Sequence, residues 1–514
     1  PGYTLFAPAD LPARATNRQL RVGIVYSATT EAKYFGDKAY SQLYAAMQHQ
    51  CRQAGIPYTL LHEDDRIDIN KIKDFDVLFL PYFANLPAAA MQEIQDTLIR
   101  AVYHYDIGLI TAGNFLTNDE DGNAHPGDSY ARMKNVLGLT LDGYFGPQDH
   151  TVTVGTGHPI VRSYAPGEQV GDYPGGYMQY YKRHYSVAQP FVTVSTNTAK
   201  HTAAWSVELG GRSVHFSSAA VMGDTDLAWR AILWSLYGDS PWVGVQVSRH
   251  SAVFIGRCDM DQSQYVDEVK DLYPALMKVI QKWKTNYNFV SSYYVNVGNN
   301  PAEGETTDWT YSGTVYKQLL SLGNEIGTHS YTHPHYTTQL SENELVFEFK
   351  DSRDVIAQNL GIDVVSAAVP GNPESLAVDL VLDKYFSYAT ADFSGTGAGY
   401  HGAMGFLTPD FNMVYLAPNL YFDFTMIGFL KYSAAHALAK WKSQYDTLAA
   451  HSPSPFMVWP WHDYGPTGYE SPDYTEEMFT EFLAHAYQRG AEFTTGAEAA
   501  ARIVSFTNTQ LRVS

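Results

Sequence analysis

Two stretches of this chain alternate predicted strands with predicted helices, which restricts each stretch to a sheet of mainly parallel strands. The first stretch begins at Leu20 and the second near Trp242. At roughly 150 residues per domain, a chain of 514 residues suggests about three domains. We therefore expect an α/β multidomain protein.

The first stretch covers residues 20–142 and comes after a surface arm over 1–19. A helix predicted within 224–240 would return to the same lobe. Its apolar run Val77–Pro81 and the turn after it resemble flavodoxin-like and glutamine-amidotransferase-like folds. An amidotransferase needs a nucleophile on a sharp strand-to-helix turn, but the corresponding turn, Thr111–Phe115, has neither Cys nor Ser. We interpret this lobe as a non-catalytic scaffold or binding lobe.

Residues 143–220 change to short strands punctuated by glycines and prolines, a pattern typical of a β-sandwich or an antiparallel layer. The run Gly175–Tyr181 gathers aromatic residues beside a flexible turn, which makes Tyr177 and Tyr180 candidates for stacking on sugar rings. Two interpretations stay open for this segment: a carbohydrate-binding module or ordinary core packing.

Residues 242–514 carry seven or so strand–helix repeats, which predict a distorted (β/α)7 barrel. The expected strands are 252–258, 287–295, 324–327, 364–370, 386–390, 456–461 and 491–494. In such barrels the active site lies at the C-terminal ends of the strands.

Polar residues follow three of these strands directly. His329 and His333 come after 324–327, and a helical turn with this i, i+4 spacing would bring both imidazoles to one side, as a metal pair requires. Asp259 and Asp261 come after the apolar strand 252–255, where they would supply a metal ligand and a general base, or would be solvated loop carboxylates.

His462 ends a very apolar strand, flanked by Trp459 and Trp461. Burial lowers the pKa of a histidine and a carboxylate neighbour raises it, so His462 is a candidate acid–base group. Asp463 would orient it or be exposed. The two tryptophans are further candidates for contact with a substrate. A lone histidine here would more often be a core residue, but the shared strand edge favours a functional site.

This set resembles the NodB-homology polysaccharide deacetylases over roughly residues 242–514. The segment His329–His333 matches their second motif fully, and the Ser341/Glu344 capping box after it fits as well. Asp259 and Asp261 match the family's Asp pair loosely, because Met260 is inserted between them and leaves their roles open.

The third motif of the family has an Arg shortly before a Pro, whereas here Pro370 lacks that Arg, so another group must position the base. Asp392, next to an aromatic residue, is the candidate for the fourth motif. The resemblance implies a divalent metal, Zn²⁺ by default, on Asp261 and the two histidines. It also implies Asp259 as general base and His462 as general acid.

The whole chain resembles the secreted fungal galactosaminogalactan deacetylases, which act on N-acetylgalactosamine units of a biofilm exopolysaccharide and carry a carbohydrate-binding module. The resemblance implies N-deacetylation of N-acetylgalactosamine or a related N-acetylhexosamine in an exopolysaccharide. We expect a monomer that is secreted or associated with the cell wall. The first residue is Pro1, and we expect that a leader such as a secretion signal was removed.

A formal charge of −20 argues against a nucleic-acid partner and suits a product that carries amines. No apolar run reaches the roughly 18 residues of a membrane span. Two alternatives stay open: a glycoside hydrolase, which would use two carboxylates without a metal, and a non-catalytic polysaccharide-binding protein. Loss of activity in a chelator, restored by metal, would exclude the hydrolase.

Overall fold

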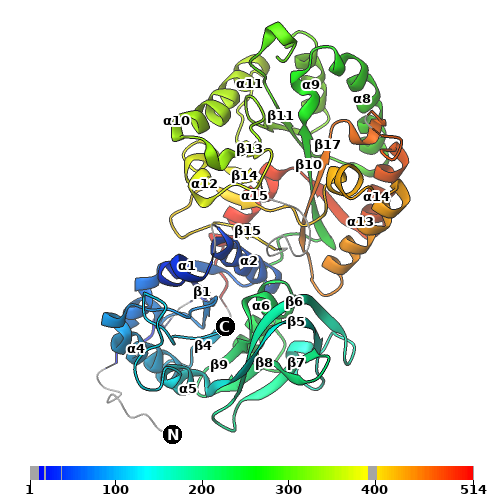
Figure 1. Cartoon of the computed structure of the whole chain (residues 1–514). Helices are drawn as coiled ribbons and strands as arrows, with labels where there is room; N and C mark the ends of the chain where they lie inside the picture. Colours follow the sequence, from blue (N-terminus) through cyan, green and yellow to red (C-terminus); the bar gives the residue numbers. More distant parts are fainter. Residues whose placement is uncertain (1–10, 17–18, 36–37, 392–401, 470, 513–514) are drawn as a thin grey trace. The chain divides into compact units, whose positions relative to one another are not determined.

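The computed structural model describes residues 11–16, 19–35, 38–391, 402–469 and 471–512. The chain divides into two compact units (Figure 1). The N-terminal unit contains residues 1–246 and 506–514, and the C-terminal unit contains residues 247–505. Among the described residues, no helix combines the length and apolar character that a membrane crossing would need.

One mixed sheet of nine strands forms the centre of the N-terminal unit. From edge to edge its strands are β2 (Tyr58–Leu61), β1 (Val22–Val25), β3 (Val77–Leu80), β4 (Gly108–Ala112), β9 (Arg212–Phe216), β8 (Lys200–Glu208), β7 (Gln189–Thr196), β5 (Leu139–Val154) and β6 (Gln169–Arg183). The first five are parallel and the others antiparallel.

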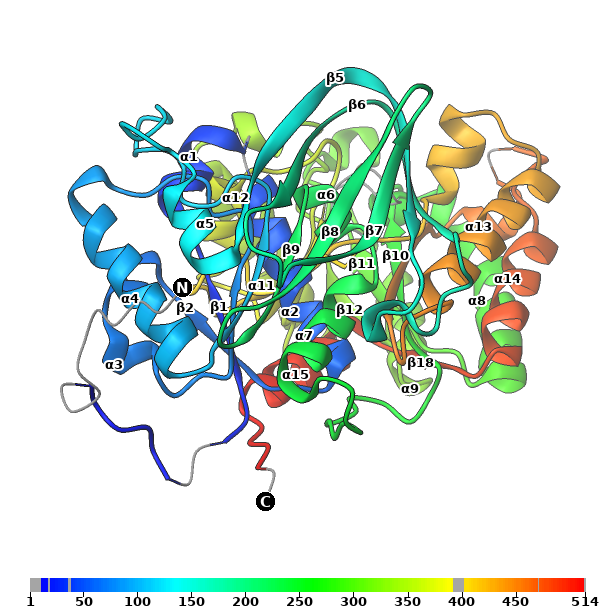
Figure 2. The ribbon, with the colours of Figure 1, turned by 90° about the horizontal axis from the view of Figure 1, so that it is seen from below.

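The β-rich segment over 143–220 therefore does not form a separate β-sandwich. Strand β9 pairs in parallel with β4 and antiparallel with β8, so it joins the strands of both segments into one sheet. Figure 2 shows β5 to β8 side by side in one curved layer. The alternative of an antiparallel layer is correct, but β5 and β6 are long, with 16 and 15 residues, and the sequence pattern did not show which sheet the strands enter.

Helices cover the sheet of the N-terminal unit. They are α1 (Ala28–Tyr34), α2 (Ala39–Ala54), α3 (Ile69–Ile72), α4 (Met91–His104), α5 (Ala131–Leu137), α6 (Ala219–Gly223) and α7 (Leu227–Tyr237). As predicted, α7 returns to the first lobe, where it packs against α2, β4 and β9. In the described part of the N-terminal arm, Arg14 donates hydrogen bonds to the carbonyls of Lys73 and Phe75.

A second sheet forms the centre of the C-terminal unit and curls into a half-barrel. Its strands are, in order, β15 (Met404–Gly405), β16 (Val414–Leu416), β14 (Tyr388–Thr390), β13 (Ser366–Ala368), β12 (Glu325–Thr328), β11 (Ser292–Val295), β10 (Ala252–Met260) and β17 (Phe456–His462), with β18 (Ala491–Thr494) on the first half of β10. All pairs are parallel except β15–β16.

Helices surround this sheet (Figure 1). They are α8 (Glu268–Tyr287), α9 (Ser312–Ser321), α10 (Glu342–Leu345), α11 (Ser352–Leu360), α12 (Leu376–Leu382), α13 (Ala434–Ala449), α14 (Glu476–Gln488) and α15 (Gly496–Thr507). Helix α8 ends at Asn288, which adopts a left-handed conformation with φ of 53°, so the strand expected from residue 287 begins only at Ser292.

A single side chain takes the place of a strand beside β17. The Asn419 amide donates a hydrogen bond to the Phe456 carbonyl at 2.9 Å and accepts one from the Val458 amide at 2.9 Å. The Asn419 backbone amide also donates to the Val458 carbonyl. Part of the edge of β17 is thereby satisfied without a regular ladder, and the described sheet is a half-barrel that does not close.

A carboxylate at the N-terminal ends of the strands ties this end of the half-barrel together. Glu325 accepts hydrogen bonds from the hydroxyls of Ser292, Ser366 and Tyr388 at 2.7, 2.7 and 2.8 Å. It also accepts one at 3.0 Å from the amide of Ala497, in the first turn of α15. The negative charge thus satisfies a free helix N–H and three strand hydroxyls at once.

We predict that Glu325→Ala lowers the free energy of unfolding by roughly 2–3 kcal/mol, because it leaves several buried donors without an acceptor. Urea unfolding of the purified variant measures this change. Glu303→Ala, which removes an exposed carboxylate of the same unit, should change the value by less than about 0.5 kcal/mol. Equal stability of the two variants would contradict a structural role for Glu325.

Candidate active site

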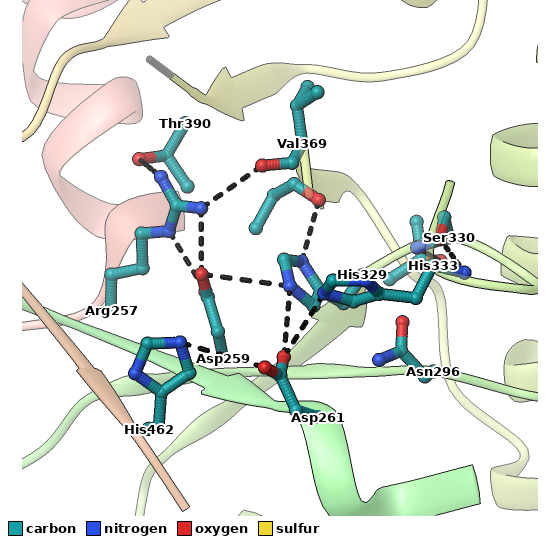
Figure 3. A network of polar contacts seen from close by, with 12 residues as sticks. Arg257, Asp259, Asp261, Asn296, His329, Ser330, His333, Val369, Thr390 and His462 are labelled. Carbon is teal, nitrogen blue, oxygen red and sulfur yellow. Dashed lines mark hydrogen bonds and ion pairs between the residues drawn. The ribbon is translucent and has the colours of Figure 1, made fainter. Parts of the chain in front are cut away.

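Strand β10 and the residue directly after it supply three polar side chains to the interior of the half-barrel. The strand is buried over its whole length, and Arg257 and Asp259 alternate along its end, with Asp261 at the next position of the same alternation. Figure 3 shows these residues converging with His329, from the end of β12, at the carboxyl edge of the sheet. Of the side chains expected to share this edge, Asp259, Asp261 and His329 lie together here, whereas Arg257 was not among the predicted residues.

Arg257 holds Asp259 through two parallel hydrogen bonds. Its Nε lies 2.9 Å from Oδ1 and its Nη2 lies 2.8 Å from Oδ2 (Figure 3). Both side chains are almost wholly buried, at 2% and 3% exposure. Nη2 also donates to the Val369 carbonyl at 3.2 Å, next to Pro370. Arg257 therefore brings its guanidinium to the segment where the expected third motif lacked an Arg.

Arg257 was not predicted from the sequence, although a signal was present. It is the one cation within the buried strand 252–260 and stands two residues before Asp259, on the same strand face. A charged residue in the middle of a buried strand needs a partner, because an unpaired buried charge is very costly. The nearest carboxylate on its face was the natural candidate.

Asp261, His329 and His333 form a group that fits a divalent metal. Oδ1 of Asp261 lies 3.3 Å from Nε2 of His329 and 3.4 Å from Nε2 of His333. One ligand atom from each residue lies within 4.8 Å of the others. Ligands about 2.1 Å from a tetrahedral zinc ion are about 3.4 Å apart, so this spacing suits such an ion.

The charge of Asp261 also suits a cation. Burial alone would raise the pKa of Asp261, but the nearby imidazoles of His333, His462 and His329 hold this pKa well below its usual range. Nδ1 of His329 donates to the Ala368 carbonyl at 2.9 Å, which orients the ring so that Nε2 is the nitrogen facing Asp261.

The two histidines meet through an irregular loop, so the helical turn proposed from their spacing is wrong. Ser330 and His333 both have left-handed backbones, with φ of 79° and 58°. Glu348 holds this loop, because its carboxylate accepts hydrogen bonds from the amides of Tyr331 and Thr332 at 3.0 and 2.8 Å. Glu348 stands in η8 (Val346–Asp351), a π-helical turn that follows the capping box at Ser341, which was predicted correctly.

His462 faces the group from β17, and its partner is Asp423. Nδ1 of His462 donates to Oδ1 of Asp423 at 2.7 Å, and the His462 backbone amide donates to Oδ2 at 3.1 Å. Nε2 points toward Asp261, 3.7 Å from Oδ2. Burial alone would lower the pKa of His462, but the charge of Asp423, with those of Asp261 and Asp259, raises this pKa to about 10.

Asp463 does not orient His462 and is not exposed, which corrects both alternatives. It is completely buried, and no described side chain donates a hydrogen bond to its carboxyl group. Burial raises its pKa well above the usual range. Asp423 was missed because it lies 39 residues from His462 in the sequence, beside no motif that would single it out.

The remaining candidates lie elsewhere. Trp459 and Trp461 have no exposed surface and pack with Phe479 and Phe482 in the core, so contact with a substrate is the wrong assignment for them. In the N-terminal unit, the Tyr177 side chain is 70% exposed. Tyr180 stacks on His201 with ring centroids 3.6 Å apart. Asp392 lies outside the described residues.

One comparison bears directly on this site. Residues 261–381 match the family model for polysaccharide deacetylases. The matched segment contains Asp261, His329, His333 and Pro370, whereas Arg257, Asp259, Asp423 and His462 lie outside it. The match therefore includes the three candidate metal ligands and spans about a quarter of the chain. No curated protein matches the sequence.

Several solved structures are similar to parts of the chain. The peptidoglycan deacetylase PdaC from Bacillus subtilis is 12% identical, with 50% of this chain and 93% of that chain covered and a TM-score of 0.32. The PuuE allantoinase is 11% identical, with 52% and 95% covered and a TM-score of 0.37. The β-galactosidase Gan42B from G. stearothermophilus is 15% identical, with 39% and 28% covered and a TM-score of 0.30. The match thus spans under a third of that galactosidase.

We predict that Arg257→Met lowers the free energy of unfolding by about 3–5 kcal/mol, because Asp259 becomes a buried charge without a partner. The double variant Arg257→Met/Asp259→Leu should lose less than the single variant, since it leaves no charge behind. Chemical denaturation of the variants measures both values. A double variant that is less stable than the single one would contradict this description of the pair.

The Asp423–His462 contact predicts a defined pH dependence in the metal-free protein. Because folding raises the pKa of His462 from an ordinary value near 6.5 to about 10, the contact stabilises the fold fully below about pH 6.5, and this stabilisation is lost as the pH rises through 10.

The variant Asp423→Asn should lower the pKa of His462, as followed by NMR titration of the imidazole. Its loss of stability relative to the unmodified protein should be largest at or below pH 6.5 and shrink toward pH 10. The matched variant Asp446→Asn removes a partner of a different histidine, His485, and should leave the titration of His462 unchanged. An unchanged pKa in Asp423→Asn would disprove the assignment.

Proposed function

We propose that this protein is a metal-dependent N-deacetylase that removes acetyl groups from N-acetylhexosamine units of a polysaccharide. The observation that carries the proposal is the grouping of a candidate metal triad with a carboxylate and a histidine, each held by its own partner. Asp259 is fixed by Arg257, and His462 is fixed by Asp423. The match of residues 261–381 to polysaccharide deacetylases supports the same chemistry.

Each of these residues has a separate role in the proposed amide hydrolysis. A divalent ion held by Asp261, His329 and His333 would polarise the acetyl carbonyl and lower the pKa of a water molecule. Asp259 takes the proton of the attacking water, since a carboxylate bound by a guanidinium still has free lone pairs. His462 starts protonated and gives its proton to the departing amine nitrogen as the C–N bond breaks, which yields acetate and a free amino sugar.

The two proton-transfer groups have separate partners. Asp423 and Asp261 favour the cationic form of His462, whose pKa of about 10 leaves it protonated at neutral pH. Asp259 instead accepts two hydrogen bonds from the Arg257 guanidinium. A base and an acid with separate partners can act in one catalytic cycle.

The arrangement favours a deacetylase over a glycoside hydrolase. A hydrolase needs two carboxyl groups free to act on a glycosidic bond. Here Asp261 lies among three imidazoles and fits a metal ion with two of them, so Asp259 alone is left to act on a glycosidic bond. In the proposed mechanism Asp261 therefore binds the metal, and Asp259 removes a proton from water.

The finer parts of the proposal concern metal, substrate and location. Zn²⁺ is the default ion for one carboxylate and two imidazoles. N-acetylgalactosamine in an exopolysaccharide is the proposed substrate, and the protein is proposed to be secreted or associated with the cell wall. A formal charge of −20 suits a product that becomes cationic as acetyl groups leave. Tyr177, 70% exposed on β6, offers a ring for the polymer in the N-terminal unit.

The proposal is tested by acetate release from N-acetylated galactosamine and glucosamine oligomers. We expect release by the purified protein, loss of release in chelator and recovery with Zn²⁺. His329→Ala should abolish both bound metal and acetate release while the protein stays folded. The matched variant His335→Ala removes an exposed imidazole of the same loop and should keep both.

His462→Ala separates acid catalysis from metal binding. It should retain bound metal and lower turnover by about 10²–10⁴-fold, the usual contribution of a general acid. Acetate release that survives metal removal, or full metal content in His329→Ala, would refute the proposed function.

A further inference from the structure

One buried polar side chain at the site has no partner. Asn296 follows the last residue of β11 and is completely buried, yet neither its Nδ2 nor its Oδ1 has a hydrogen-bond partner within the described residues. A buried amide without hydrogen bonds destabilises a fold by about 1–3 kcal/mol. Such a group calls for a functional explanation.

The strand register places Asn296 between two of the candidate metal ligands. The pairing of β10 with β11 ends at Met260 and Val295, and that of β11 with β12 ends at Val295 and Thr328. The next position on each strand is Asp261, Asn296 and His329, respectively, and neighbouring strands lie about 4.8 Å apart.

The side chain of Asn296 also faces the interior. It follows Ser292 and Tyr294 on the same strand face, and both of these donate or accept hydrogen bonds inside the half-barrel. Figure 3 shows the Asn296 amide beside Asp261 and below His333. Register, alternation and the close view agree on this placement.

The backbone of Asn296 is held rigidly, so its side chain is positioned in advance. Its amide donates to the Ser263 hydroxyl at 2.8 Å, and that hydroxyl donates back to the Asn296 carbonyl at 2.9 Å. The Thr307 hydroxyl also donates to this carbonyl, at 3.1 Å. The side chain alone is left without a hydrogen bond.

A complementary group lies on the neighbouring strand. Oδ1 of Asp261 is buried and has ion-pair contacts with two imidazoles, but it makes no well-formed hydrogen bond. A ligating carboxylate is normally fixed by a hydrogen bond from a second residue. Asn296, beside Asp261 at the end of the neighbouring strand, offers two N–H donors.

We propose that Asn296 is a positioning residue for the metal centre, whose amide N–H orients the carboxylate of Asp261 when a divalent ion binds. This inference rests on the metal site of the proposed function but not on the substrate or the reaction. Within the described residues the amide has no other partner, so it is available for this contact.

The test compares Asn296→Leu with the unmodified full-length protein, using Zn²⁺ and Co²⁺ alone as probes. Calorimetric competition should show a dissociation constant about 10–100-fold higher for each ion, the usual effect of losing such a partner. The metal-free variant should melt at the same or a higher temperature, because the unsatisfied amide is gone. The rise in melting temperature on adding Zn²⁺ should be smaller.

Asn85→Leu is the matched control. Asn85 of the N-terminal unit is also completely buried with both amide atoms unpartnered, so its replacement should leave metal affinity unchanged. Unaltered affinity in Asn296→Leu, or no binding of either ion by the unmodified protein, overturns the inference. Metal binding that weakens as expected in a protein without acetate release would overturn the proposed function alone.

Discussion

The buried ion pair between Arg257 and Asp259 is the interaction on which the site depends. Moving both charges out of water costs several kcal/mol per ion, and only a close, fully hydrogen-bonded geometry offsets that cost. The guanidinium meets this requirement with two hydrogen bonds to Asp259 and further ones to the Val369 carbonyl and the Thr390 hydroxyl. Because these partners lie on or beside β10, β13 and β14, the pair also fixes the relative position of three strands.

The other charged groups of the site are paired in a similar way. The nearest partner differs from one carboxylate to the next: Asp259 has Arg257, Asp261 has His329 and His333, and Asp423 has His462. In the proposed reaction this distribution would let one carboxylate act as a base, a second hold a metal and a third keep a histidine protonated. Without such partners, carboxylates close together would raise one another's pKa values, and their roles would no longer be distinct.

The two ends of the half-barrel serve different purposes. At the N-terminal ends of the strands, Glu325 satisfies every donor that faces it, which stabilises the fold. At the carboxyl ends, Asn296 and Asp463 are buried with their side chains unsatisfied. Trp459 and Trp461 of β17 pack against aromatic residues of the covering helices α8, α13 and α14. The stability that the core and the Glu325 network supply offsets the free-energy cost of these unsatisfied side chains at the candidate active site.

The sequence by itself determined the features that depend on neighbours along the chain: the strand–helix alternation, the capping box at Ser341 and the strand-end positions of the Asp and His residues. Periodicity and short spacings are local, so they can be read without a fold. The tertiary structure alone decided which sheet the β-rich strands enter, the left-handed loop between His329 and His333, and the partners Arg257 and Asp423. Arg257 reaches Val369 across 112 residues, and Asp423 reaches His462 across 39. Such contacts arise from strand register and sheet curvature, which no local pattern encodes.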